Sequence, residues 1–255
     1  MIKTEEEIKI LREAGRRLAV VLDAVIAKVR PGISTAELDT MARELILVDG
    51  DTPAFLNYKP YGASRPFPAT LCVSVNDAVV HGIPNENPRK LAEGDIVGID
   101  IGLVHRRMIV DMAKTVPVGK IDAAVEKLLA ATKESLLRGI GAALAGNRVG
   151  DIGAAIETYA KPFGYGIVEE LGGHGVGHFV HEEPYIPNVG NPGKGPKLLP
   201  GMVLAIEPML NLGSREIKLD TDGYTWKTVD GKRSAHFEHT IVITSSEPDI
   251  LTIVL

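Results

Sequence analysis

The sequence predicts an α+β fold in two halves, each built from a pair of helices and an antiparallel sheet. Apolar residues recur at helical spacing in four segments, one pair in each half of the chain. Displacing the sequence by 114 residues superposes three residues of these segments: Gly32 on Gly146, Leu38 on Ile152 and Gly50 on Gly164. We therefore expect one domain over residues 1–255, with pseudo-symmetric halves at about 4–118 and 119–255.

The helices of the first half are predicted from capping boxes, in which a Ser or Thr and an acid three residues later satisfy free backbone N–H groups. Thr4 and Glu7 form the first box, and apolar periodicity follows until Pro31-Gly32. A second box begins at Ser34, and its helix is predicted to end at Gly50.

The helices of the second half carry simpler signals. Asp122 is the predicted N-cap of a helix that ends near Gly146. Asp151 is the predicted N-cap of the next helix, which ends near Gly164. Aspartate suits this position because its carboxylate accepts hydrogen bonds from the free N–H groups of the first turn.

An apolar hairpin is predicted around a turn at His105-Arg106, with Asp100 on its first strand and Asp111 on its second. A turn centred there places Asp100 opposite Asp111, because opposed residues of an antiparallel hairpin keep a constant sum of numbers. Directly opposed residues share a face, with Cβ atoms about 4.5–5.5 Å apart. Two aspartates so placed among apolar residues repel each other unless a cation or a proton lies between them.

Two further acids, Glu207 and Glu238, lie in apolar runs of strand length. Buried glutamates are rare unless they are paired or bind a metal. With Asp100 and Asp111 they carry four negative charges, which two divalent cations would neutralise, and His174 adds an imidazole. Oxygen-rich coordination with one imidazole suits manganese, iron or cobalt. Paired metals of this kind activate a shared water.

His174 belongs to a glycine-rich stretch, residues 171–184, that contains three histidines. Glycine lets the backbone pass close to whatever the histidines hold. The stretch is not a zincin motif, because His-Glu-x-x-His would need a histidine where Tyr185 stands, four residues after His181. A lone histidine is usually a satisfied core or surface group, so the carboxylates elsewhere in the chain are what favour a site here, with His181 beside an apolar surface.

Composition and charge exclude several other classes. A net charge of −5 offers no basic surface for nucleic acid. No run approaches the ~18 apolar residues of a membrane span, and the N-terminus has no apolar signal region. The one cysteine, Cys72, cannot form an intramolecular disulfide, which favours a reducing compartment. We expect a cytoplasmic protein without nucleic-acid or membrane partners.

Taken together, these motifs resemble one family, the type I methionine aminopeptidases, which have the pita-bread fold. The similarity covers about residues 4–254 and contains five motifs in the order of the family. The motifs are Val79-Val80-His81-Gly82-Ile83-Pro84, Gly98-Ile99-Asp100 with Asp111 eleven residues later, Gly173-His174-Gly175 with His181 seven residues after His174, Ile206-Glu207-Pro208-Met209, and Glu238-His239-Thr240.

The resemblance implies hydrolytic removal of the N-terminal methionine from peptides and nascent proteins, with a preference for a small second residue. It implies two divalent metal ions per chain, which could be cobalt, manganese, iron or zinc. The implied ligands are Asp100, Asp111, His174, Glu207 and Glu238. A nascent chain could be met at the ribosome, and we expect the protein to be a monomer.

Further roles follow from the same resemblance. Glu207 would handle the proton of the attacking hydroxide, and His181 would stabilise the tetrahedral oxyanion. His81 would contact the scissile amide nitrogen or the substrate backbone. The methionine pocket would include Cys72, Phe67 and Tyr224. Phe67 and Tyr224 depart from the residues usual in the family, as do Val180 and His236 outside this set.

Three other interpretations stay open at this point. A prolidase or aminopeptidase P-like peptidase shares the five ligands, although those enzymes usually carry an additional N-terminal domain. A non-catalytic pita-bread protein could bind a partner without metal, although all five ligands are intact in this acidic chain. A hydrolase using Cys72 as its nucleophile is the weakest of the three, because no His-Asn pair is tied to it.

Overall fold

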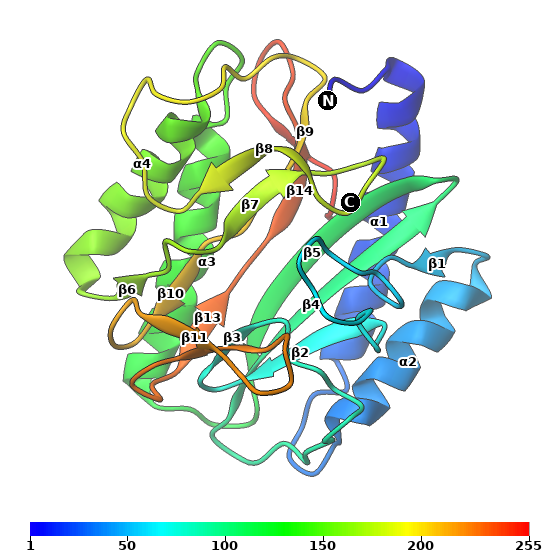
Figure 1. Ribbon diagram of the computed structural model, residues 1–255, viewed down its shortest axis with the longest axis vertical. Coiled ribbons are helices and arrows are strands. Elements are labelled where there is room, and N and C mark those ends of the chain that lie inside the picture. The colour runs from blue at the N-terminus through cyan, green and yellow to red at the C-terminus, as the bar shows by residue number, and fades with distance from the viewer. Residues whose placement is uncertain (255) are drawn as a thin grey trace.

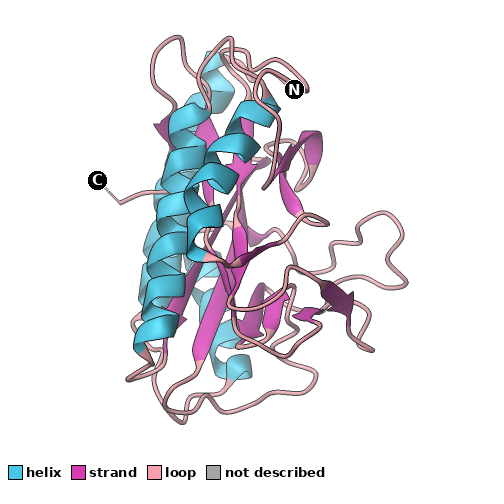
Figure 2. Cartoon of the chain, turned by 90° about the vertical axis from the view of Figure 1, so that its left-hand side faces the viewer, coloured by secondary structure: helices cyan, strands magenta, loops and turns pink. Residues whose placement is uncertain are grey.

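In the computed structural model, which describes residues 1–254, the helices lie on one side of the strands (Figure 2). Within this layer the helices form two pairs. The bounds of these α-helices are α1 (Glu5–Ile26), α2 (Thr35–Val48), α3 (Ala123–Ala142) and α4 (Val149–Ala160). In Figure 1, α1 and α2 lie at the right of the view and α3 and α4 lie at the left. None of the described helices is long and apolar enough to cross a membrane.

The predicted helix starts hold at three of four places. Thr4 and Ser34 are N-caps of α1 and α2 with complete capping boxes, and Asp122 occupies the N-cap position of α3. The predicted N-cap at Asp151 is wrong, because α4 begins after Arg148. Asp151 lies one turn inside and accepts a hydrogen bond from the Arg148 backbone N–H at 2.7 Å. An acid at the third helical position thus satisfies the backbone N–H of the N-cap residue, as the acid of a capping box does.

The strands form two larger and two smaller antiparallel sheets. The first-half sheet joins β1 (Thr52–Pro53), β4 (Ile96–His105), β2 (Leu71–Val75) and β5 (Met108–Pro117). The second-half sheet joins β15 (Asp249–Ile250), β14 (His239–Val242), β9 (Val203–Ile206), β7 (Gly172–Gly175) and β8 (Glu182–Pro187). One smaller sheet joins β13 (Ser234–His236), β10 (Met209–Asn211) and β6 (Gly166–Ile167). The other joins β11 (Ile217–Leu219), β12 (Trp226–Thr228) and β3 (Ala78–Val80).

The structure has two large apolar cores. One packs α1 and α2 against β2, β4 and β5 and also contains residues of β9 and β14, and the other packs α3 and α4 against β9, β10 and β14. The first core contains fully buried Leu18 and Ile99, and the second contains Ile152 and Ile206. The division of the chain near residues 118 and 119 stays a prediction.

The β4–β5 hairpin differs from its predicted register. The turn falls at Arg106 and Arg107, which both have positive φ (46° and 70°), as a two-residue hairpin turn requires. Asp100 therefore pairs with Ala113 and Asp111 with Gly102, and the predicted direct opposition of the two aspartates is wrong. The register moves by two residues, so Asp111 keeps its face of the sheet and becomes a diagonal neighbour of Asp100.

Two threonines join the halves where β5 lies beside the segment 236–240. Thr115 Oγ1 accepts from the backbone N–H of His236 at 2.9 Å and donates to its carbonyl at 2.8 Å. Thr240 Oγ1 forms the same pair of bonds with Asp111, at 3.0 and 2.7 Å. Between them, the Glu238 N–H donates to the Ala113 carbonyl at 2.9 Å. These contacts bring the acids of both halves to one place.

Candidate active site

A pocket lies at this junction and joins an acidic, histidine-containing floor to an apolar wall. Its floor contains Asp100, Asp111, Glu207, Glu238, His81, His174 and His181. Its wall contains Phe55, Tyr58, Pro60, Phe67, Cys72, Val180 and Tyr224. The structure thus brings every predicted site residue to a single pocket.

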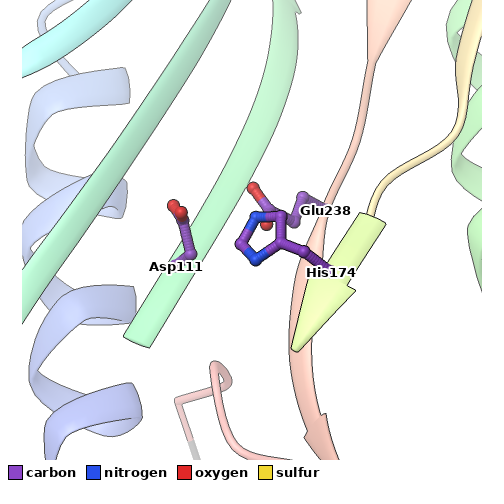
Figure 3. A group of neighbouring side chains, drawn as sticks. All are labelled: Asp111, His174 and Glu238. Carbon is purple, nitrogen blue, oxygen red and sulfur yellow. The ribbon is translucent and has the colours of Figure 1, made fainter. Parts of the chain in front are cut away.

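Three of the predicted ligands meet most closely. Asp111 on β5, His174 on β7 and Glu238 just before β14 each offer one donor atom, and these atoms all lie within 4.8 Å of one another. Figure 3 shows the three side chains converging from separate strands of the two halves. All three residues are buried. A nitrogen and two carboxylate oxygens at this spacing can hold a divalent cation.

Three buried carboxylates of the floor each have one oxygen without a hydrogen-bond partner among the described residues. Asp100 Oδ1, Asp111 Oδ1 and Glu238 Oε1 accept no hydrogen bond. Burial, followed by the charge of Glu207, raises the pKa of Asp100 to about 6. Burial and the neighbouring carboxylates raise the pKa values of Asp111 and Glu238 well above the ordinary range.

These unpartnered oxygens fit bound cations. A buried carboxylate without a hydrogen bond is costly, and three of them in one pocket repel one another. Divalent metal ions would coordinate the free oxygens and turn this repulsion into attraction. The donor set of the floor, mostly carboxylate oxygen with one imidazole nitrogen, is one that hard or intermediate metals accept.

Glu207 has a different environment from the other acids. His174 Nε2 lies 3.5 Å from its Oε1, and His236 Nε2 lies 3.3 Å from its Oε2. Burial raises the pKa of Glu207, but the side chain of His236 and the nearby histidine charges outweigh this effect and lower it. His174 Nδ1 lies 2.9 Å from the Gly175 carbonyl, which can only accept, so Nδ1 is the donor and Nε2 is the nitrogen that faces Glu207.

His81 and His181 flank this floor as neutral imidazoles. Burial lowers the pKa of His81 to about 4. His181 stays accessible from the pocket, yet the packed groups around its ring, followed by repulsion from His174, lower its pKa to about 4. The rings of His174 and His181 are 4.4 Å apart, and Tyr58 Oη lies 2.8 Å from His181 Nδ1. When Tyr58 donates to Nδ1, Nε2 of His181 carries a proton that it can donate.

The apolar wall contains the three residues predicted for the methionine pocket. Phe67 and Tyr224 pack edge to face with ring centroids 5.2 Å apart, and the Tyr224 hydroxyl donates to the Arg65 carbonyl. Cys72 belongs to the same buried cluster. Burial and the nearby aspartates raise the pKa of its thiol well above the ordinary value. A thiol that resists ionisation is a poor nucleophile, which disfavours the cysteine-hydrolase interpretation.

Sequence reasoning missed three pocket residues, namely Phe55, Tyr58 and Pro60. They lie between β1 and β2 in a segment without regular secondary structure, where no periodicity marks a buried face. The one signal was an aromatic and apolar composition within a loop. Aromatic residues in a loop are as compatible with an exposed surface as with a pocket, and Tyr61 in the same segment is fully exposed.

A carboxylate and imidazole centre between two helix-backed sheets defines a metallohydrolase class, and comparison with known proteins identifies the family. The model of metallopeptidase family M24 matches residues 9–245. The chain belongs to this family.

Relatives of high similarity are methionine aminopeptidases. The chain is 46% identical to the methionine aminopeptidase of Clostridium perfringens, covering 100% of this chain and 99% of that protein. It is 48% identical to methionine aminopeptidase 1 of Bacillus subtilis, covering 98% of each.

Solved structures confirm the pita-bread fold. The methionine aminopeptidase of Rickettsia prowazekii matches with a TM-score of 0.94 and 36% identity, covering 99% of each chain. The prolidase of Pyrococcus horikoshii shares the fold with a TM-score of 0.76 and 23% identity, covering 100% of this chain and 64% of that one. The prolidases are therefore more distant than the methionine aminopeptidases.

Proposed function

We propose that this protein hydrolytically removes the N-terminal methionine from peptides and nascent proteins, and that it uses two divalent metal ions. One observation carries the proposal: buried carboxylates with unpartnered oxygens lie directly beside an apolar wall. Such a site can hold cations and an apolar side chain at the same time. The full-length similarity to relatives named methionine aminopeptidase supports the same reaction.

Five residues would hold the metals, as the family resemblance implies. These are Asp100, Asp111, His174, Glu207 and Glu238, four carboxylates and one imidazole that line the same pocket. Bound divalent metals supply Lewis-acid polarisation of the peptide carbonyl and lower the pKa of a water. Cobalt, manganese, iron and zinc all accept this donor set, and the choice among them is left to measurement.

Three side chains would then act on the substrate. Glu207, whose pKa is held low by its imidazole neighbours, is ionised and can accept a proton from the attacking water. His181, neutral at physiological pH, can donate its Nε2 proton to the carbonyl oxygen as negative charge develops there. His81, also neutral, would contact the scissile amide or the substrate backbone.

The apolar wall would select methionine. An unbranched thioether suits a surface of Phe67, Cys72 and Tyr224, because sulfur packs well against aromatic rings. A small second residue is preferred on the basis of the resemblance. The chain itself begins Met1-Ile2, and a β-branched second residue should protect Met1 from removal. Mass spectrometry of the intact protein should find Met1 present, and clean loss of Met1 would contradict this specificity.

The setting of the reaction belongs to the same proposal. The single cysteine favours a reducing compartment, and we place the enzyme in the cytoplasm as a monomeric single domain that acts on free peptides or on chains at the ribosome. A non-catalytic binding role is the second candidate. Metal analysis of the purified protein separates the two, because a binding module of this kind has no need of bound cations.

The experiment that tests the proposed function is metal-dependent peptide turnover. Chelated protein is reconstituted with manganese or cobalt and offered peptides that begin Met-Gly, Met-Ala and Met-Leu. We expect methionine release from the first two, much slower release from the third, and none without metal. Cleavage of Xaa-Pro peptides in preference to Met-Ala peptides would favour the prolidase interpretation, and undiminished turnover in chelator would exclude metal-dependent hydrolysis.

A further inference from the structure

The loop between β7 and β8 carries two pocket residues, Val180 and His181. In Figure 1 this loop extends from the second-half sheet toward α1. A side-chain carboxylate shapes its interior, because Glu182 Oε1 accepts hydrogen bonds from the backbone N–H groups of His178 at 2.6 Å and Phe179 at 3.2 Å. The position of His181, the next residue before Glu182, therefore depends on where this carboxylate is held.

The partner of Glu182 comes from the start of the chain. Lys3 Nζ lies 2.7 Å from Glu182 Oε2, and the two side chains are 0% and 2% exposed. The Lys3 backbone N–H donates to the Gly201 carbonyl at 2.8 Å, which fixes the N-terminal segment against the strand layer. The Met1 ammonium is a weaker and exposed neighbour, 3.7 Å from Glu182 Oε2, and His178 Nδ1 lies 3.8 Å from Oε1. Lys3 therefore makes the shortest and the most deeply buried charged contact of the Glu182 carboxylate.

Gly177 makes room for this lysine. A Cβ atom at Gly177 would lie 2.3 Å from Lys3 Cε, and its φ of +140° is a conformation that side-chain-bearing residues rarely adopt. The Lys3 stem therefore passes directly against the loop backbone. The Gly177 carbonyl also accepts from the Ile109 N–H at 2.7 Å, which ties the same point to β5.

A second contact joins the same two segments. His178 Nε2 lies 2.7 Å from Glu7 Oε1, while the other oxygen of Glu7 completes the capping box of α1. The backbone N–H of Thr4, followed by the side chain of His178, lowers the pKa of Glu7 to about 2. The N-terminal segment thus holds the loop at two places, one buried and one at the surface.

A buried ion pair is weak evidence for stability, because desolvation of both ions offsets their attraction. An apolar pair of similar volume would pack at least as well. What the charges add is direction: Lys3 orients one carboxylate oxygen, so the other faces two backbone N–H groups. The geometry of the loop, rather than the stability of the fold, is the property that this arrangement controls best.

We propose that Lys3, acting through Glu182, is a positioning residue for His181, so that the N-terminal segment is part of the active centre. This inference rests on the proposed function, since it takes His181 as the group that donates to the substrate oxygen. Displacement of a catalytic group by about 1 Å can lower a rate by roughly 100-fold. Loss of the orientation that Lys3 imposes should therefore appear as a lower rate of catalysis.

The test compares Lys3→Met and Glu182→Gln with a matched control, Lys9→Met, which breaks the exposed Lys9–Glu6 pair on the same segment. We expect kcat to fall roughly 10- to 100-fold in the first two variants, with KM and bound metal nearly unchanged, and to stay at the wild-type value in the control. Hydrogen exchange of the His178 and Phe179 amides should quicken in parallel. Should Lys3→Met not fold, Lys3→Met/Glu182→Gln, which leaves no unpaired buried charge, takes its place.

A double-mutant comparison shows whether the effect passes through His181. In a His181→Ala background, Lys3→Met should change kcat little, because the group that it positions is gone. If adding Lys3→Met to His181→Ala lowers kcat by the same factor as it does in wild type, the proposal is overturned. Wild-type kcat in a folded Lys3→Met variant would also overturn it. Wild-type kcat in His181→Ala alone would refute the role given to His181 under the proposed function, and the positioning role would fall with it.

Discussion

The two halves of the molecule meet through matching backbone contacts but supply different chemistry. Thr115 bonds both backbone groups of His236, and Thr240 bonds both backbone groups of Asp111. Exchanging residues 111–115 with 236–240 therefore reproduces the junction, with Ala113 and Glu238 paired at its centre. In this exchange His236 takes the place of Asp111, so an imidazole stands in one half where a carboxylate stands in the other.

The imidazole of His236 lowers the pKa of the acid beside it, Glu207. Asp100 and Asp111 are diagonal neighbours on the first-half hairpin, and burial raises both pKa values. Burial raises the pKa of Glu238 in the second half as well. Glu207 in the second half lies between two imidazoles, and its pKa is lowered although it is buried too. The same backbone frame thus yields carboxylates that require a cation beside a carboxylate that the protein itself keeps charged.

The largest effect is expected from a substitution of Asp111. Asp111→Asn removes one charge at nearly constant shape, so it should abolish activity and weaken metal binding. In the chelated protein it should instead raise Tm at pH 7.5, by about 2–4 °C for each kcal/mol of repulsion removed. Calorimetry of chelated wild type and variant at two pH values measures both effects.

The pH dependence follows from the raised pKa of Asp111. The metal-free fold binds the Asp111 proton more tightly than the unfolded chain does, so its stability falls as pH rises above the ordinary aspartate range. The cost of burying Asp111 is therefore greater at pH 7.5 than near pH 5, where the gain in Tm from Asp111→Asn should be smaller. A chelated variant that melts below wild type at both pH values would show that the aspartates do not repel.

A smaller loss is expected at His181, which lies beside the metal-binding floor without belonging to it. His181→Ala should lower kcat by about two orders of magnitude, as the loss of an oxyanion donor does. The metal content should stay near that of wild type. Loss of metal from the variant, measured by elemental analysis, would make His181 a ligand and contradict the assigned role.

The smallest effects concern the two threonines. Thr115→Val and Thr240→Val each leave a buried backbone N–H and carbonyl without a partner, so each should lower the free energy of unfolding by about 2–4 kcal/mol. Urea unfolding should give similar losses for the two variants if the junction is as symmetric as its contacts indicate. Thr240→Val should also weaken metal binding, because it frees the backbone of Asp111, whereas unequal losses of stability would contradict the symmetry.

Much of the architecture could be predicted because its signals are local. The capping boxes at Thr4 and Ser34 predict the starts of the first two helices. The 114-residue displacement superposes Ser34 on Arg148, which is the N-cap of α4. The repeat was therefore a better guide to that helix than the local preference of Asp151. Family motifs identified every acid and histidine of the floor, because each lies in a short run of characteristic residues.

What could not be predicted depends on turn geometry and on contacts between distant segments. The hairpin turn needs two positive φ angles, which Arg106 and Arg107 adopt without any glycine or asparagine to mark them. Nothing near Lys3 in sequence indicates that its ammonium group reaches Glu182, 179 residues away. Tyr58 likewise meets His181 only after the loop before β2 has folded over the pocket.

The central claim is that both halves together hold two divalent ions, and native mass spectrometry tests it most directly. Chelated protein titrated with manganese or cobalt should take up two ions per chain, and Asp100→Asn, altered only in the first half, should take up fewer at the same free metal concentration. The account predicts that wild-type protein binds two ions per chain, and that the same metal supports turnover of Met-Ala peptides. Wild-type protein that binds no ion, or an Asp100→Asn variant that binds two ions as well as wild type does, would contradict it.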